Sequence, residues 1–474
     1  MSSLNIDVQG MREKILDLAM RGKLVKQDTS DEPASVLLEK IKAEKEQLIK
    51  EKKIKKTKPL PEITDEEKPF DIPDSWEWVR FGNIINLISG RDIPKKDHLD
   101  KPTKNSIPYI TGASNLLKDR ININEWIEEP KTIVEKGTIL ISVKGTIGKI
   151  AILTAKKAHI ARQIMGIENI FLLSQNFQKY FLESYVEQLK NKSKSMIPGI
   201  SREDVLLASF PLPPLEEQNR IAAKIEELFE LLDTIEQAQK KYEDLQGELK
   251  EKILSLGMQG KLVDQDKNDE SASVLVEQIN AEKEQLIKEK KIKKTKPLPE
   301  ISDEEKPFDI PDSWEWVRLG NVSQFLNGRA YKKSELLKNS SFTPILRVGN
   351  LFTNSEWYYS NLELEDNKYI DNGDLIYAWS ASFGPRIWMG GHVIYHYHIW
   401  KVTLSDVVAK QFIYYFLLND KNVIGETDLH GSTMKHITKV NMENLSFPLP
   451  PLNEQKRIAA KIEELFTVID STAS

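Results

Sequence analysis

The sequence contains no cysteine among its 474 residues. Disulfides, thiolate-bound zinc and cysteine nucleophiles are therefore excluded. It also lacks any run of about eighteen apolar residues, and its start lacks the basic residues and apolar stretch of a secretory signal. We therefore expect a soluble cytoplasmic protein. An apolar content of 40% is enough for the ordinary cores of about two to four domains.

An overall excess of positive charge is also missing, because the formal net charge is −5. This argues mildly against a nucleic-acid ligand, since neutralisation of phosphates by Lys and Arg dominates such binding. The charge is unevenly distributed, however. Residues 80–209 hold 20 Lys and Arg against 13 Asp and Glu, whereas residues 318–446 hold 13 against 12. The first of these segments is therefore basic.

Sequence motifs for catalysis are absent as well. The chain has no phosphate-binding loop of the Walker type, no Gly-rich dinucleotide fingerprint and no Asn/Asp-Pro-Pro-Tyr stretch of the kind that amino-methyltransferases use. Asp74 and Glu77 resemble a nuclease carboxylate pair, but Val79 stands where a lysine is needed. No nucleophile, base and orienting group form a recognisable set. The sequence therefore predicts no catalytic site.

An internal duplication is the strongest positive signal. The twenty residues of 43–62 recur unchanged at 281–300, and DEEKPFDIPDSWEWVR follows both copies at an offset of 238. A second shared block, FPLPPL with RIAAKIEELF, opens at Phe210 and at Phe447, where the offset is 237. Near-identity of so many polar residues exceeds what packing requires, because surface positions usually tolerate change.

Between the shared blocks the two copies diverge. Residues 80–209 and 318–446 match only at scattered places, such as Gly90-Arg91 beside Gly328-Arg329. A recent gene duplication explains this pattern. A functional explanation is compatible with it: the shared frame contacts one kind of partner twice, and the two inserts contact different ligands.

A long helix is predicted from Ile221 onward, because apolar residues recur there at heptad spacing. Its seam positions are Ile221, Ile225, Leu228, Leu232, Ile235, Tyr242, Leu249, Ile253 and Leu256. Residues 454–466 match the start of this helix, and residues 14–20 match its end at 252–258. We therefore expect the two terminal helices to lie together and to pack antiparallel against the central helix. Alternatively, each stripe covers only its own neighbouring domain.

A second helix is expected over residues 34–54, after a helix stop at Gly22. It ends in a lysine-rich stretch, which is either a solvated face or a contact for phosphate or an acidic partner. Each insert has a mixed α/β pattern. In the first insert, two strands follow Gly137 and a helix covers about 175–190. In the second, strands follow Gly373 and cover 393–402, and a helix lies near 407–418.

Basic, amide and aromatic side chains gather in the predicted turns of both inserts. Arg, Lys, Gln and Asn read guanine and adenine edges, although many such residues contact only phosphate. The candidates in the first insert are Arg91, Lys144, Lys149, Lys156, Arg162, Gln163, Lys194 and Ser195. The candidates in the second are Arg329, Arg347, Trp379, Ser380, Arg386, His396, Lys401, Ser432 and Lys435.

Three histidines of the second insert are the best candidates for a metal site. His396 and His398 alternate along a predicted strand and so share a face, and His392 is nearby. No carboxylates stand at a recognisable ligand spacing from them. Packed or DNA-facing histidines are therefore the favoured interpretation, and we expect no bound metal.

Taken together, the Gly22–Val25 segment, the lysine-rich arm, the IPDSWEWVR strap, the insert and the PLPPLxEQxRIAxKIExLF block, all present twice, resemble a type I restriction-modification specificity subunit. The resemblance covers nearly the whole chain. It implies an α+β multidomain protein, pseudo-twofold by internal duplication, with two mixed α/β target recognition domains separated by an antiparallel coiled coil of long helices. The implied domains are 1–79, 80–209, 210–317, 318–446 and 447–474.

The resemblance also implies a non-catalytic subunit that reads a bipartite, asymmetric double-stranded DNA site. Its helical frame sets the gap and holds two adenine methyltransferase subunits, through which restriction and translocase subunits are recruited. We expect docking at Leu48, Lys52, Lys53, Leu228, Leu232 and Leu465. S-adenosylmethionine, ATP and magnesium are expected on the partners and not on this chain. The rival hypotheses are a stand-alone nuclease or methyltransferase with an unrecognised site, and a helical adaptor that does not bind DNA.

Overall fold

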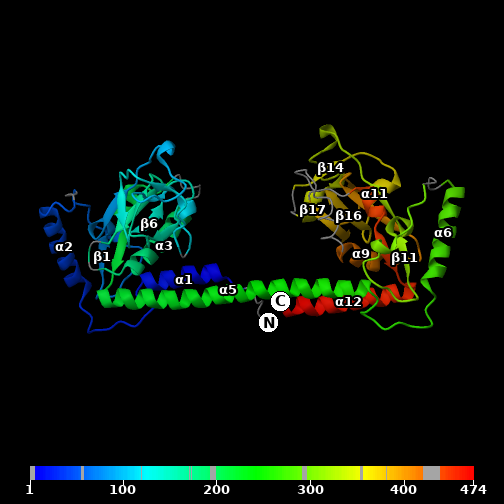
Figure 1. The fold of residues 1–474 in the computed structure, drawn as a ribbon, viewed down its shortest axis with the longest axis horizontal. Coiled ribbons are helices and arrows are strands. Elements are labelled where there is room, and N and C mark those ends of the chain that lie inside the picture. The colour runs from blue at the N-terminus through cyan, green and yellow to red at the C-terminus, as the bar shows by residue number, and fades with distance from the viewer. Residues whose placement is uncertain are drawn as a thin grey trace. The chain divides into compact units, whose positions relative to one another are not determined.

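The computed structural model describes residues 6–54, 58–118, 120–169, 171, 173–192, 199–290, 296–352, 356–380, 382–419 and 438–473. The chain divides into two compact units (Figure 1). We call Ile6–Gln239 the first unit and the part from Lys240 onward the second unit. None of the described helices is long and apolar enough to cross a membrane.

The first unit combines helices with short strands. Its helices are α1 (Val8–Met20), α2 (Ala34–Lys50), α3 (Gln175–Lys192), α4 (Arg202–Leu206) and the first part of α5 (Leu215–Met258). Its strands are β1 (Glu77–Arg80), β2 (Asn86–Ser89), β3 (Ile107–Ile110), β4 (Trp126–Ile127), β5 (Ile133–Glu135), β6 (Ile139–Ser142), β7 (Ile150–Ile152), β8 (Lys157–Ile160), β9 (Ile164–Glu168) and β10 (Ser209–Leu212).

The second unit has the same plan. Its helices are the remainder of α5, α6 (Ala272–Lys288), α7 (Leu319–Val322), α8 (Val348–Phe352), α9 (Lys410–Asn419), α11 (Lys439–Glu443) and α12 (Leu452–Ala473). Its strands are β11 (Glu315–Arg318), β12 (Ser323–Asn327), β13 (Thr343–Leu346), β14 (Tyr358–Ser360), β15 (Tyr369–Ile370), β16 (Leu375–Ser380), β17 (Ser382–Ile387), β18 (Val393–Tyr395), β19 (Ile399–Leu404) and β20 (Ser446–Leu449).

The two inserts share one sheet topology although their sequences differ. The first insert has sheets of order β2-β9-β6-β7 and β4-β3-β8-β5. The second has β12-β19-β16-β17 and β14-β13-β18-β15, which is the same order strand for strand. In each second sheet one pair, β3 with β8 and β13 with β18, is parallel. The predicted mixed α/β inserts are confirmed. The stretch 393–402 is not one strand, because a turn at His396–His398 separates β18 from β19.

The shared sequence blocks close the base of each insert. β1 pairs antiparallel with β10, so that Val79 lies opposite Phe210, and β11 pairs with β20 in the same register. Phe210 is fully buried and its ring lies 4.7 Å from that of Phe181 on α3. The strap and the exit block are therefore two strands of one base, which explains why they are conserved between the copies together.

Helix α5 packs against α1 in the first unit and against α12 in the second, and Figure 1 shows both helices running alongside it. In the first unit, Arg12 of α1 pairs with Asp233, and its guanidinium lies 4.9 Å from the centre of the Phe229 ring. In the second unit, the Tyr242 hydroxyl donates to Thr472 of α12 at 2.9 Å. Four residues further along α5, Gln246 contacts Ile469, which precedes Thr472 in α12. The predicted antiparallel packing is therefore confirmed in the second unit. That the two terminal helices lie together stays a prediction.

One predicted seam position is wrong. Leu249 is 51% exposed, whereas Ile221, Ile225, Leu232 and Ile253 are buried. A straight helix has 3.6 residues per turn and drifts by about 20° per heptad from a strict seam. Around Leu249, α5 therefore faces α12 with the positions three residues before and four residues after it: Gln246 donates to the Ile469 carbonyl at 3.1 Å, and Ile253 is buried.

Candidate functional site

Three loops of the first insert meet at one end of its sheets. We call Gly90–Asp92, Val143–Lys149 and Ala161–Gln163 together the first tip. Gly90 makes the close approach possible, because a Cβ atom there would lie 2.1 Å from the Ala161 carbonyl oxygen. Only glycine fits such a position without displacing backbone.

Two further contacts hold the first tip together. The Val143 amide donates to the Gln163 carbonyl at 2.8 Å, which joins the β6–β7 turn to the β8–β9 turn. Arg162 is bound to Asp92 through both its backbone amide, at 3.1 Å, and its Nε atom, at 2.7 Å. Asp92 thus orients an arginine whose side chain remains 66% exposed.

The first tip brings together most of the residues that the sequence singled out in this insert. It carries the exposed side chains of Arg91, Lys144, Lys149, Arg162 and Gln163. Lys156 does not join them, because its carbonyl accepts from the Lys136 amide in the β7–β8 turn at the opposite end of these strands. Lys194 and Ser195 lie outside the described residues.

The second insert builds a corresponding end, the second tip, from Gly328–Ala330, Trp379–Ser380 and His396–His398. A Cβ atom on Gly328 would lie 2.3 Å from the Tyr395 carbonyl oxygen. The Trp379 amide donates to the His398 carbonyl at 3.1 Å. The predicted residues Arg329, Trp379, Ser380 and His396 therefore lie together.

The second tip is aromatic where the first is cationic. The Trp379 ring lies 5.7 Å from that of Trp400 and 5.1 Å from that of His398. Its Nε1 atom donates to the Tyr397 carbonyl at 2.8 Å. Burial lowers the pKa of His396 to about 4, so that this imidazole is neutral near pH 7. Tyr397 itself is 37% exposed.

Two arginines of the second insert lie in or beside this tip. Arg329 pairs with Glu335 at 2.9 Å. The Arg347 guanidinium lies 4.5 Å from the centre of the Tyr358 ring, and Arg347 directly follows Leu346, whose carbonyl accepts from the His396 amide. Among the described atoms, Nη1 of Arg329 and Nε of Arg347 are buried without a hydrogen-bond partner. Both groups therefore retain donor capacity.

Arg386 and Lys401 do not belong to the second tip. Both lie opposite Ile376, whereas the tip is at the Ser380 end of β16. The Lys401 ammonium is 2.7 Å from an Asp374 carboxylate oxygen and donates to the Tyr369 carbonyl at 3.0 Å. Its charge is compensated inside the domain. Ser432 and Lys435 lie outside the described residues.

The three histidines do not come together with one another or with carboxylates in a set of three ligands within the described residues. Across the described parts of the chain, no three His, Asp or Glu side chains are grouped so as to hold an ion. His392 instead contacts an Asp371 carboxylate oxygen at 2.7 Å and stacks on the Tyr369 ring. His396 and His398 pack within the aromatic cluster, as the favoured interpretation of the sequence had it.

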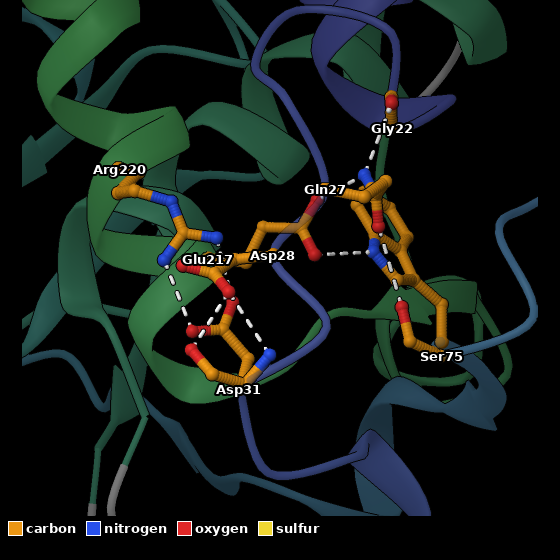
Figure 2. Close-up of polar contacts among 9 residues, drawn as sticks. Gly22, Gln27, Asp28, Asp31, Ser75, Glu217 and Arg220 are labelled. Carbon is orange, nitrogen blue, oxygen red and sulfur yellow. Dashed lines mark hydrogen bonds and ion pairs between the residues drawn. The ribbon is translucent and has the colours of Figure 1, made fainter.

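A buried polar cluster joins the insert base to α5 in the first unit (Figure 2). Glu217 is 1% exposed and accepts hydrogen bonds from Trp76 Nε1, at 2.9 Å, and from Gln27 Nε2. Beside it, Arg220 pairs with Asp31 at 2.6 Å. Burial raises the pKa of Glu217, and the two donors oppose that shift. We call these five residues the joint, because they connect a loop, the strap and a helix.

The joint is repeated in the second unit. Glu454 accepts from Trp314 Nε1 at 3.0 Å and from Gln265, and Arg457 pairs with Asp269 at 2.7 Å. Burial raises the pKa of Glu454 as well. Sequence reasoning missed this site. Its signal was the identity of these side chains between the two copies, which we had interpreted only as part of a shared frame.

The predicted docking residues fall into three groups by burial. Leu232 is 5% exposed, so in this structure it packs inside its own unit, and its predicted contact with a partner stays a prediction. Leu48 and Leu465 pack partly against the cores of their own units, and Leu228 is half-buried. Lys52 and Lys53 are exposed just beyond α2. Only these two lysines present most of their side chain to solvent, and their contact with a partner stays a prediction.

The sequence as a whole matches known proteins. A family model described as the type I restriction modification DNA specificity domain matches residues 73–243 and 311–473, so that both copies are covered. The specificity subunit of the type I restriction enzyme EcoAI from Escherichia coli is 35% identical over 98% of this chain and 90% of its own length. That of EcoEI, also from Escherichia coli, is 30% identical over 100% of this chain and 92% of its own.

The fold matches a solved structure. One chain of "Structural basis underlying complex assembly and conformational transition of the type I R-M system" aligns with a TM-score of 0.60. The alignment covers 85% of this chain and 93% of that one, at 19% identity. At this identity the likeness concerns the fold alone.

Proposed function

The chain belongs to the family of type I restriction-modification specificity subunits, and we propose that it reads DNA sequence for such a complex, each insert binding one half of a two-part, asymmetric site. Members of this family are not catalytic, and no catalytic cofactor belongs on this chain. Methyl transfer and cleavage would take place on partner subunits. We place the protein in the cytoplasm, with the DNA.

One observation carries this proposal. The two inserts share a strand order and a joint, yet they present different side chains at equivalent tips. A protein that presents two different DNA-reading surfaces on one frame needs both inserts joined to that frame in the same way, with different side chains at their tips. It predicts an asymmetric target, because the two halves face unlike readers.

The helical frame supports the partner assignment. The exposed lysines after α2 recur after α6, as part of the identical blocks 43–62 and 281–300. Two equal surfaces predict two copies of one partner, which we take to be a methyltransferase subunit that carries S-adenosylmethionine. Restriction subunits, with ATP and magnesium, would join through it. The frame would also set the number of unread base pairs between the half-sites.

DNA affinity of the full-length chain tests the proposal. Lys144 and Lys149 are exposed on the first tip. Replacing both with Glu places two negative charges where phosphates are expected, and we expect binding of target-containing duplex to weaken at least tenfold at about 100 mM salt. Fluorescence anisotropy measures the change. The same assay distinguishes the DNA-reading function from a helical adaptor, whose DNA affinity would not change.

A matched control uses the same substitution away from the tip. Lys14 of α1 has a side chain that is 69% exposed and Lys23 just beyond α1 is also exposed, and replacing both with Glu should leave DNA affinity unchanged. Equal losses for both variants, or none for either, would contradict a DNA-reading tip. Methyl transfer or cleavage by the purified chain without partners would support a stand-alone enzyme instead.

A further inference from the structure

The β8–β9 turn and the β18–β19 turn occupy the same structural position in the two inserts. We infer that these two turns read the bases: Arg162 of the first turn recognises a guanine, and Tyr397 and His398 read the other half-site from a turn that itself carries no guanidinium. The inference rests on the proposed function and adds to it which positions determine specificity. It is carried by backbone equivalence and by the side chains placed on it.

The backbone around the two turns is held by matching hydrogen bonds. Five backbone hydrogen bonds of the first insert each have a counterpart of similar length at the equivalent position of the second insert. In the first insert, amides donate to carbonyls as follows: Gly90 to Ile164 at 3.2 Å, Arg91 to Ile160 at 2.9 Å, Ala161 to Ile110 at 2.9 Å, Ile164 to Ala161 at 2.9 Å and Val143 to Gln163 at 2.8 Å. In the same order, the bonds of the second insert are Gly328 to Ile399 at 3.3 Å, Arg329 to Tyr395 at 3.0 Å, His396 to Leu346 at 2.9 Å, Ile399 to His396 at 3.0 Å and Trp379 to His398 at 3.1 Å.

This set of bonds fixes the correspondence residue by residue. Arg162 corresponds to Tyr397, and Gln163 corresponds to His398. Arg162, Gln163 and Tyr397 are exposed and His398 is half-buried. A shared backbone would permit the same side chains, yet these positions differ in charge, size and hydrogen-bonding groups. Side chains that differ on a shared backbone are expected where the two inserts bind different ligands. The turns are therefore better candidates for reading bases than residues elsewhere on the inserts.

The first turn presents an oriented arginine. Asp92 binds the Nε atom of Arg162 at 2.7 Å, so this contact does not use the two terminal nitrogens of the guanidinium. An arginine held in this way can direct both terminal N–H groups at the N7 and O6 atoms of a guanine, which is the commonest specific contact in the major groove. Gln163, exposed beside it, has the donor and acceptor that an adenine edge requires.

The second turn has neither an arginine nor a carboxylate to orient one. The residue that corresponds to Asp92 is Ala330, so no carboxylate stands there. Tyr397 offers a hydroxyl and a ring face, and His398 lies with its ring edge to face against Trp379 at 5.1 Å. Such groups read bases through apolar contact with a thymine methyl group and through neutral hydrogen bonds. The two half-sites should therefore differ at the base pairs that face these turns.

Chromosomal alleles in the organism that carries the gene test the inference, with methylated adenines mapped across the genome. Arg162→Lys keeps the charge but removes the guanidinium fork. We expect the advantage of guanine over other bases at one position of one half-site to fall roughly 10- to 100-fold, with the other half-site unchanged. His398→Ala should alter only the other half-site.

Arg120→Lys is the matched control, since Arg120 is an exposed arginine of the same insert outside the tip. It should leave the motif unchanged. An unchanged motif in Arg162→Lys, a change in both half-sites, loss of all methylated sites, or the same change in Arg120→Lys would each overturn the inference. Absence of a two-part motif in the wild type would instead overturn the proposed function, so the two failures are distinguishable.

Discussion

At the scale of single residues, the carboxylate of the joint connects sequence to architecture. Glu217 satisfies the indole N–H of Trp76 where no water is expected, and Glu454 does the same for Trp314. A buried donor that loses its partner costs more than the hydrogen bond itself contributes. We therefore expect these two acids to matter more for stability than any exposed charge on the same helices.

The first prediction is that Glu217→Ala lowers the free energy of unfolding of the first unit by about 1–3 kcal/mol, because Trp76 and Gln27 lose their acceptor. Denaturant unfolding of the full chain, followed by tryptophan fluorescence, measures this. Its neighbour Glu216 is exposed, and Glu216→Ala should change stability by less than about 0.5 kcal/mol. Equal effects of the two substitutions would show that the joint contributes nothing.

The second prediction concerns pH. Burial raises the pKa of Glu217 above its usual value of 4.5, so the folded state holds this proton more tightly than the unfolded state. The resulting stabilisation is complete below pH 4.5 and decreases as pH rises through the folded-state pKa. Glu217→Gln has no carboxyl group to titrate at this position, so it does not show this pH dependence. Its stability relative to wild type should therefore rise with pH over this window and then level off; a constant difference would show that the pKa is not raised.

Sequence reasoning at this scale succeeded where a side chain's neighbours are close along the chain. Arg162 and Gln163 were identified because they stand in a short polar turn, and they are exposed. It did not anticipate the contact of Lys401 with Asp374, because only the pairing of β16 with β19 brings these two residues together. It missed Tyr397, because an aromatic residue in a strand-like stretch is ordinarily assigned to a core.

At the scale of elements, α5 shows how one helix packs against two others. Its seam was predictable near the first unit, where Ile221 and Ile225 are fully buried. Apolar residues at heptad spacing move gradually around a helix of 3.6 residues per turn. Whether this leaves Leu249 exposed depends on where α12 lies. That position is a property of the tertiary structure and not of the local sequence.

The third prediction is made at this scale. Gly247 lies within α5, and a Cβ atom there would meet nothing within 4 Å. Gly247→Ala should therefore raise the free energy of unfolding by up to about 1 kcal/mol, through helix propensity alone. Thermal unfolding monitored by circular dichroism measures the change. Ala238→Gly, at an exposed position of the same helix, should lower stability by a similar amount. A loss of stability in Gly247→Ala would mean that this glycine has a contact or a bend to serve.

At the scale of the whole molecule, the duplication was the most informative feature of the sequence. It predicted two equivalent frames and two unlike inserts, and the family relationship agrees with both. The shared strand order of the inserts was harder to predict, because their sequences have diverged beyond visible similarity. Strand pairing between distant segments, such as β3 with β8, leaves little local trace.

The central claim is that this chain gives a methylating complex its two-part DNA target. Deleting the gene and mapping methylated adenines across the genome tests it most directly. We predict that one asymmetric motif, made of two short sequences separated by unread base pairs, loses its methylation and regains it when the gene is restored. Methylation that is unchanged by the deletion, or loss confined to a single undivided motif, would contradict the claim.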